Sequence, residues 1–306
     1  MLMKFRAHDT FFIRKGWLSK GMRNIEIAAD VFTSKQNNPM DVLGIGANMV
    51  KALRYWLVAV GLTQEVRIGG RSAQEKTDFG RIIYENDRYF EELGTLWLLH
   101  YKLATNKDEA SAWYYFFNEF KMTEFTRDDF VTQINKYLRN TEEGEKPERT
   151  LEDDYNCIIN TYVPRIKSNP EKVQPESNID CPLGELGLVD IANKKDRVYK
   201  KSSPKKDTLH PLILLAVIID QHDKANPSWH DNNKKREVRI SAIQNDINNA
   251  GKVFNLDIIS LTNLLYQIEL LKHIKVIRTA GLDVIQILTD MTFEQCVEEY
   301  YASING

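Results

Sequence analysis

The chain has 306 residues, of which 42% are hydrophobic and 27% are charged, and its formal net charge is −2. This length exceeds that of a typical single domain, and the apolar content is sufficient for two or three cores. The slightly negative charge excludes a protein that coats nucleic acid over its whole surface, so any DNA affinity has to come from local basic patches.

Targeting and redox signals are weak. No apolar run approaches the roughly 18 residues of a membrane span, and polar residues interrupt 1–16, where a signal peptide needs an apolar core. We therefore expect a cytoplasmic protein with no membrane partner. Cys157, Cys181 and Cys296 are odd in number and far apart, which indicates reduced thiols and not a disulfide framework or a zinc cluster.

The segment 42–61 predicts a short helix with two different faces, entered through Gly44 and Gly46. From Ala47 onward one arc is apolar and holds Met49, Val50, Leu53, Trp56, Leu57 and Val60. The opposite arc carries Asn48, Lys51, Arg54 and Tyr55. Amide, amine, guanidinium and phenol groups on one face are typical of a helix that contacts nucleic acid, although they also suit an ordinary solvated surface.

A small β ribbon follows this helix, with the pair Gly69–Gly70 inside it. Helix, turn and ribbon in that order are typical of a winged helix-turn-helix module. Arg14 and Lys15, in the basic N-terminal segment, extend the positive patch around the Lys51 and Arg54 face. We expect the nucleic-acid-binding residues to be Arg14, Lys15, Asn48, Lys51, Arg54 and Tyr55.

The middle of the chain is rich in aromatic residues at helical spacing. Runs 93–104 and 108–120 predict helices, and their aromatic side chains indicate a packed core more than a base-stacking platform. A third helix is expected over 126–139, with Thr126 as N-cap and Asp129 at the capping-box position. After a charged linker at 141–150, a fourth is expected over 151–162.

The lysine-rich segment 194–206 contains Ser202, Ser203 and Pro204 and is interpreted as a solvated linker at a domain boundary. The segment 168–182, rich in Pro, Asn and Ser, is expected to be a loop. Beyond the boundary, helices are predicted over 211–220, 241–253 and 258–271. Two β-rich runs then flank a turn that contains Gly281.

The pattern predicts a mainly α fold with winged helix-turn-helix-like modules at both ends and a helical middle. The three predicted parts are an N-terminal DNA-binding module at 1–92, an aromatic-rich middle at 93–200 and a C-terminal module at 205–306. Because winged helices also serve in dimerisation and protein docking, this fold does not by itself establish DNA binding. The oligomeric state does not follow from the pattern.

Catalytic signals are few. A dinucleotide fingerprint fails because its third glycine position is Met49, and a P-loop fails because Ala52 follows Lys51. His8 and Asp9 form either an acid/base or metal-holding pair or a structural pair. His222, Asp223 and His230 are candidate metal ligands for magnesium, manganese or zinc, although their spacing matches no metal motif.

Four ordered blocks span nearly the whole chain: FRAHDTFFIRKGWLSKGM, LGIGANMVKALRYWL, GTLWLLHYKLATN with SAWYYFFNEF, and DCPLGELGLV. Together they resemble the blocks of the bacterial family DUF4007. The first block holds His8, Arg14 and Trp17, and the second holds Gly44, Gly46, Asn48, Lys51 and Arg54.

The resemblance implies a role in bacterial DNA phosphorothioation and phage defence, beside a sulfurtransferase similar to phosphoadenosine-phosphosulfate (PAPS) reductases. One branch of the family, SspB, is implied to be the DNA-nicking component. Two departures from the family pattern weaken the expectation of metal chemistry and of DNA affinity, but not the resemblance itself. Asp9, whose side chain has a shorter reach, replaces the glutamate of the family's His-Glu pair, and Ala47 replaces a lysine.

We therefore expect a DNA-binding component whose partners are DNA and this sulfurtransferase. A nicking endonuclease that depends on magnesium or manganese, with His8 and Asp9 as candidate catalytic residues, remains one alternative. A non-enzymatic adaptor between proteins remains another.

Overall fold

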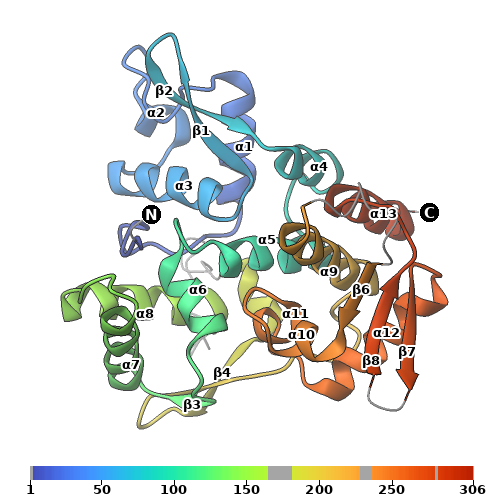
Figure 1. The fold of residues 1–306 in the computed structure, drawn as a ribbon. Coiled ribbons are helices and arrows are strands. Elements are labelled where there is room, and N and C mark those ends of the chain that lie inside the picture. The colour runs from blue at the N-terminus through green and yellow to red at the C-terminus, as the bar shows by residue number, and fades with distance from the viewer. Residues whose placement is uncertain (1–2, 165–180, 228–235, 280–281, 306) are drawn as a thin grey trace, which may run out of the picture. The chain divides into compact units, whose positions relative to one another are not determined.

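The structure is a computed structural model that describes residues 3–164, 181–227, 236–279 and 282–305. The described residues are mainly helical with small antiparallel sheets, which confirms the predicted fold class at that level (Figure 1). The chain divides into two compact units, residues 1–202 (unit 1) and 203–306 (unit 2). Both 1–92 and 93–200, predicted as separate modules, lie in unit 1. No helix in the described ranges is long and apolar enough to cross a membrane.

Unit 1 begins with three helices and a hairpin. The elements are α1 (Trp17–Ile27), α2 (Pro39–Leu43), α3 (Ala47–Ala59), β1 (Thr63–Ile68), β2 (Arg71–Lys76) and α4 (Asp78–Asn86). Leu53, Trp56 and Leu57 on α3 are fully buried, so the predicted apolar face is confirmed. α1 packs closely on this face, because a Cβ added to Gly21 would lie 2.6 Å from Leu57 Cδ1.

The hairpin β1–β2 turns at Gly69 and Gly70. Ile68 pairs with Arg71 across the turn, and both glycines have positive φ, 56° and 77°. Two positive φ values in a two-residue loop are the signature of a type I′ turn, which matches the twist of the flanking strands. The chain then enters α4, where Gly80 lies so close to the Leu62 carbonyl that an added Cβ would collide with it.

The middle helices of unit 1 enclose an aromatic core. They are α5 (Leu93–Thr105), α6 (Ser111–Asn118), α7 (Arg127–Asn140) and α8 (Glu148–Tyr162). Eight aromatic residues of the two runs predicted as core are all buried: Trp97, Tyr101, Trp113, Tyr114, Tyr115, Phe116, Phe117 and Phe120. The capping box of Thr126 and Asp129 at the start of α7 is also present. The core interpretation of these aromatic residues is therefore confirmed.

The prediction that 194–206 is a solvated linker is wrong for part of the segment. β5 (Val198–Lys201) pairs with both β4 (Val189–Asn193) and β3 (Glu124–Phe125), in the order β3-β5-β4. Lys201 Nζ donates to the carbonyl oxygens of Phe116 and Phe120, at 2.6 Å each. These contacts hold a lysine-rich strand in place. The short 3-10 helix η3 (Pro182–Leu186) precedes β4. The predicted loop 168–182 lies mostly outside the described residues.

Unit 2 combines helices with a three-stranded antiparallel sheet of order β6-β8-β7. Its elements are α9 (Pro211–Ala225), β6 (Arg236–Arg239), α10 (Ile240–Asn245), α11 (Ala250–Val253), α12 (Ile258–Leu270), β7 (Ile274–Thr279), β8 (Leu282–Ile287) and α13 (Phe293–Asn305). The single helix predicted over 241–253 is wrong: it is broken between α10 and α11. Asn248 there has a φ of 65°, and Asn and Asp residues favour such turns over helix interiors.

All three cysteines are buried. Burial raises the pKa of the Cys157 thiol well above its usual value and raises the pKa of Cys296 to about 12. The reactive thiolate form of these two residues is therefore suppressed at neutral pH.

Candidate nucleic-acid interface

The polar face of α3 presents only part of its predicted set to solvent. Asn48 and Lys51, in the first half of the helix, are exposed. Tyr55 is half-buried, and its hydroxyl donates to the Glu109 carbonyl at 2.9 Å. Burial, followed by the nearby charge of Asp154, raises the pKa of Tyr55 well above its usual value. Tyr55 therefore anchors α3 to the helical middle of unit 1.

Arg54 joins α3 to the hairpin. Its Nε donates to Glu65 Oε1 at 2.8 Å, and its Nη2 donates to Glu65 Oε2 at 2.6 Å and to Ser72 Oγ at 2.8 Å. Partial burial raises the pKa of Glu65, but hydrogen bonds from Arg54, Gln74 and Ser72 outweigh it and lower the pKa overall. Much of the Arg54 charge is thus matched by a carboxylate, and the hairpin is fixed against the helix.

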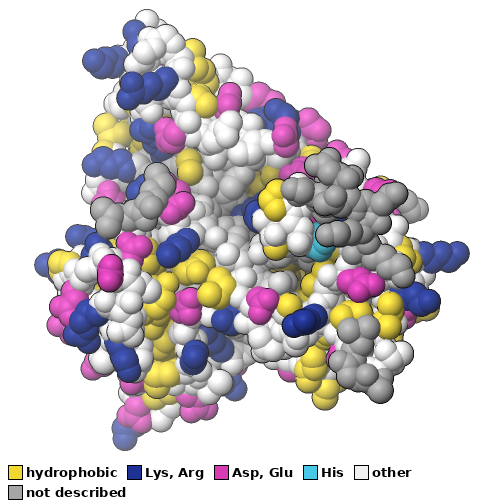
Figure 2. Space-filling view, viewed as in Figure 1, with side chains coloured by type: hydrophobic (Ala, Val, Ile, Leu, Met, Phe, Trp, Pro, Cys, Tyr) yellow, Lys and Arg dark blue, Asp and Glu magenta, His cyan; other side chains and the backbone are white. Residues whose placement is uncertain are grey.

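The hairpin contributes cations that the sequence pattern did not indicate. Arg67 and Arg71 are exposed on either side of the Gly69–Gly70 turn. Figure 2 shows Lys and Arg side chains gathered over the hairpin and the adjoining edge of unit 1. An arginine on each side of a two-glycine turn was the available signal. We call Asn48, Lys51, Arg67 and Arg71 the helix–hairpin surface.

Arg14 and Lys15 line a different hollow of unit 1, with a volume of about 240 Å³. The Arg14 guanidinium lies over the rings of Phe11 and Trp17, 5.6 and 5.2 Å from their centroids. Lys15 Nζ is 4.0 Å from a Glu91 carboxylate oxygen. Aromatic faces hold the Arg14 side chain through cation–π contact, so this residue contributes to packing as well as to surface charge.

His8 does not face solvent. Its ring is fully buried, and its Nε2 lies 2.7 Å from Asp154 Oδ1 on α8, 146 residues along the chain. The Thr10 N–H donates to His8 Nδ1 at 3.1 Å, which assigns the ring proton to Nε2 and makes it the donor to Asp154. The ring stacks on Trp56, with centroids 6.0 Å apart. This contact ties the N-terminal segment to α3 and α8.

Asp154 completes this buried pair. Burial raises the pKa of its carboxyl group, against the hydrogen bonds from His8 and from the Arg6 N–H, which lower it. The candidate partner of His8 in the sequence, Asp9, has a φ of 52° in the turn that follows. The His8 ring lies between Trp56 and Trp113, with ring centroids 6.0 and 5.6 Å away, so the pair with Asp154 is part of the packed interior.

His222 and Asp223 also lie together, at the end of α9. His222 Nδ1 is 2.9 Å from Asp223 Oδ1, and Arg236 Nη2 donates to the same oxygen at 2.8 Å. A guanidinium on this carboxylate opposes the approach of a metal cation. His230 lies outside the described residues. Within the ranges that are described, no three His, Cys, Asp or Glu side chains are grouped so that they could hold a metal ion.

Comparison with known proteins supports the family resemblance. The model of the family "Protein of unknown function (DUF4007)" matches residues 5–301. The fold resembles a magnesium ion-bound SspB crystal structure, with a TM-score of 0.83 and 22% identity over 99% of this chain and 89% of that chain. A second SspB crystal structure gives a TM-score of 0.80 and 23% identity over 99% and 86% of the two chains.

At 22% and 23% sequence identity, the similarity to these two structures establishes a shared fold and not a shared activity. No curated protein sequence matches the chain. The family model, in contrast, covers almost the entire chain, including the segments that form α3, the hairpin and α12. The protein described here therefore belongs to the DUF4007 family.

Proposed function

We propose that this protein is the DNA-binding component of a bacterial DNA phosphorothioation and phage-defence system. In this role it contacts DNA through the helix–hairpin surface of unit 1 and acts beside the PAPS-reductase-like sulfurtransferase that the family resemblance implies. The fold shared with two SspB crystal structures supports the assignment to a phosphorothioation system.

One observation carries the DNA-binding part of the proposal: exposed amide, ammonium and guanidinium groups lie on α3 and on a hairpin fixed to it. Lys and Arg side chains neutralise phosphates, and an asparagine on a helix can pair with an adenine edge in the major groove. Arg54 links α3 to Glu65 and Ser72 of the hairpin, and Arg67 lies opposite Ser72 on the same face of the hairpin. Arg71 lies on the other face of the hairpin, beside the turn.

The order α1, α2, α3, β1, β2 supports a winged helix-turn-helix interpretation of this region. In that arrangement α3 is the helix that enters the major groove, and the hairpin is the wing beside it. We propose the same winged helix-turn-helix interpretation for α10, α11, α12, β7 and β8 in unit 2, but we assign the DNA contacts to unit 1 alone.

The test is a fluorescence anisotropy titration of the full chain with labelled duplex and single-stranded DNA at several salt concentrations. We expect Lys51→Ala with Arg71→Ala to weaken binding about tenfold and to reduce the salt slope by about one unit per lost phosphate contact. Lys121→Ala removes an exposed lysine elsewhere in unit 1 and serves as the control. Unchanged affinity and unchanged slope in the double variant would refute the proposal.

A metal-dependent nickase remains the alternative, because one SspB structure with this fold is magnesium ion-bound. The described residues of this chain do not supply a set of ligands that fits magnesium. His8 and Asp154 are buried, and Arg236 donates a hydrogen bond to the Asp223 carboxylate. We therefore derive no step through magnesium.

Conversion of supercoiled plasmid to open circles by the purified protein, with manganese or magnesium and not with chelator, would establish the nickase. Co-purification with the sulfurtransferase and no DNA shift would instead favour the adaptor.

A further inference from the structure

Large apolar side chains are exposed along one side of α12. Ile259 is 71% exposed and Leu270 is 82% exposed, and Tyr266 lies between them on the same helix. At about 100° per residue these three fall within roughly 40° of one another, opposite the buried Leu261, Leu265 and Ile268. We call Ile259, Tyr266 and Leu270 the α12 ridge. Large exposed apolar side chains that recur on one side of a helix are typical of a protein interaction site.

The charges around α12 argue against a nucleic acid as the occupant. One guanidinium, that of Arg278 on β7, lies 6.0 Å from the Tyr266 ring centroid, and it is paired with Asp283 at 2.9 Å. The helix sequence, IISLTNLLYQIEL, contains no lysine or arginine. Its one charged residue, Glu269, accepts a hydrogen bond from the Val276 N–H at 2.8 Å. Binding of DNA depends on cations that neutralise phosphates, whereas the core of a protein interface is apolar and rich in aromatic residues.

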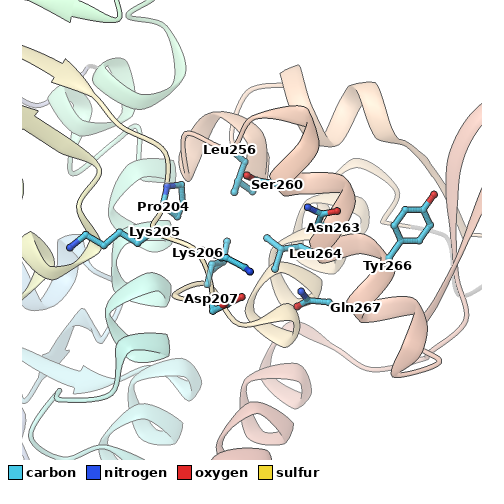
Figure 3. A pocket seen from close by; sticks show the side chains of 11 residues that line it. Pro204, Lys205, Lys206, Asp207, Leu256, Ser260, Asn263, Leu264, Tyr266 and Gln267 are labelled. Atoms are coloured by element: carbon cyan, nitrogen blue, oxygen red, sulfur yellow. The ribbon is translucent and has the colours of Figure 1, made fainter.

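A cavity of about 310 Å³ lies beside the ridge, between α12 and the segment 204–207. Figure 3 shows Asn263, Leu264 and Gln267 pointing from α12 toward that segment. Leucine side chains line the cavity together with amide and hydroxyl groups: Leu209, Leu256, Leu264, Ser260, Asn263 and Gln267. This combination can bury one large apolar side chain and also satisfy a peptide backbone.

The opposite wall of the cavity carries one ammonium group that faces α12. Lys206 extends into the space between the segment and α12 with Asp207 beside it, whereas the Lys205 side chain points away from the cavity (Figure 3). An acidic side chain of a bound segment would therefore be attracted to Lys206.

We propose that the α12 ridge and its cavity dock an acidic amphipathic segment of a partner protein. The apolar side chains of that segment pack on Ile259, Tyr266 and Leu270, and one of them enters the cavity. A carboxylate of the same segment pairs with Lys206. This docking is separate from DNA binding by unit 1 and does not depend on it.

A phage-displayed library of random peptides, panned on the full chain, tests this chemistry while the partner is still unidentified. Counter-selection on the Ile259→Ser, Leu270→Ser double variant removes peptides that bind elsewhere. We expect the retained peptides to combine large apolar residues with Asp or Glu. A retained peptide is then synthesised with a fluorescent label and titrated with the full chain.

We expect the double variant to weaken binding of that peptide at least about tenfold, because central apolar contacts dominate such interfaces. Lys206→Glu should weaken it several-fold, with a larger effect at low salt. Ile27→Ser, at a 77% exposed apolar residue of α1, and Lys35→Glu, at another exposed lysine, are the matched controls and should leave binding unchanged. Circular dichroism melts of every variant verify folding.

Other occupants give different results, and each would overturn the proposal. Retained peptides that are rich in Lys and Arg, or a library in which no peptide survives the counter-selection, exclude an acidic segment on this ridge. A wild-type dimer that the double variant dissociates, measured by light scattering after size exclusion, assigns the ridge to a second copy of the chain. Loss of DNA affinity in the double variant assigns it to nucleic acid.

Discussion

Each unit contains a helix followed by an antiparallel hairpin, but the two helices expose opposite chemistry. In unit 1, α3 exposes Asn48 and Lys51 before the hairpin β1–β2. In unit 2, α12 exposes Ile259 and Leu270 before the hairpin β7–β8. Both units have the same order of elements because their apolar residues recur at the spacing that buries one face of each helix. The class of partner depends instead on the few side chains that each helix exposes. Local fold and function are therefore determined by different residues of the same helix.

The units also differ in how a strand is held to its neighbouring helix. In unit 1 the Arg54 and Glu65 side chains are 29% and 42% exposed, whereas the Arg236 side chain in unit 2 is only 5% exposed beside Asp223. Exposed ion pairs contribute little to stability, but removal of one partner from a buried pair leaves an uncompensated charge. The comparison thus makes quantitative predictions for each unit.

The largest expected effect comes from close backbone approaches, one in each unit. Gly80→Ala places a methyl group against the Leu62 carbonyl, and Gly251→Ala places one against the Gln244 carbonyl. We expect each to lower the free energy of unfolding by about 3 kcal/mol or more through overpacking against backbone. Hydrogen exchange followed by mass spectrometry should show the loss of protection in the mutated unit first.

The control is Gly46→Ala. Gly46 has a φ of −65° and nothing within 4 Å of its added Cβ, so only the loss of a good N-cap residue is expected, below about 1 kcal/mol. Equal loss of protection in both units after Gly80→Ala would show that they unfold together and are not separate in stability.

Arg236→Met gives the next largest effect. Its guanidinium donates to Asp223 Oδ1 and to the Thr289 carbonyl, both at 2.8 Å. Methionine leaves both acceptors without this donor, and we expect a loss of about 2 to 3 kcal/mol in urea unfolding. Arg54→Met in unit 1 is the matched substitution and should cost less than about 1 kcal/mol. If Arg54→Met lowered the free energy of unfolding more than Arg236→Met, burial would not explain the difference between the two ion pairs.

A glutamate introduced on the exposed face of α3 or of α12 tests which of the two proposed surfaces binds DNA. Lys51→Glu should weaken DNA binding about tenfold, since it removes a cation and adds an anion beside phosphates. Asn263→Glu adds one anion to the exposed face of α12 without removing a cation, and it should leave DNA affinity unchanged. The measurement is the same anisotropy titration. Similar losses in both variants would mean that DNA contacts both units.

The smallest expected effect concerns the titration of Glu65. Its pKa in the folded protein lies below the ordinary value of 4.5, so its stabilising contribution is complete above that value and is lost as the pH falls through the lowered pKa. Carboxyl carbon chemical shifts should report this low pKa, and Arg54→Met should raise it. Solvent screening limits the associated stability to less than about 1 kcal/mol. An unchanged pKa in the variant would show that Arg54 does not hold the carboxylate.

Local patterns predicted much of the fold. The apolar arc of α3, the capping box at Thr126 and the aromatic core depend on residues a few positions apart, and all three are confirmed. β5 was missed because its lysines suggested a solvated segment, whereas contacts with residues as far away as Phe116 fix Lys201. Such distant contacts do not appear in any short window of sequence.

The candidate site shows the same division between local and distant information. The exposed positions of Asn48 and Lys51 agree with the predicted polar arc of α3. The partners of His8 and Arg54, which are Asp154 and Glu65, come from other elements and were not indicated. The binding or catalytic roles of His8 and Arg54 remain predictions, as do those of Arg14, Lys15 and His222.

Burial of the three thiols makes the native chain suitable for site-specific labelling. Cys157, Cys181 and Cys296 are shielded, so maleimide dyes should react preferentially with cysteines introduced on the surface. Cysteines at Lys51 and Leu270 would place one dye on each unit without replacement of any native cysteine. Energy transfer between the dyes would then report the distance between the helix–hairpin surface and the α12 ridge, and how DNA or a bound peptide changes it.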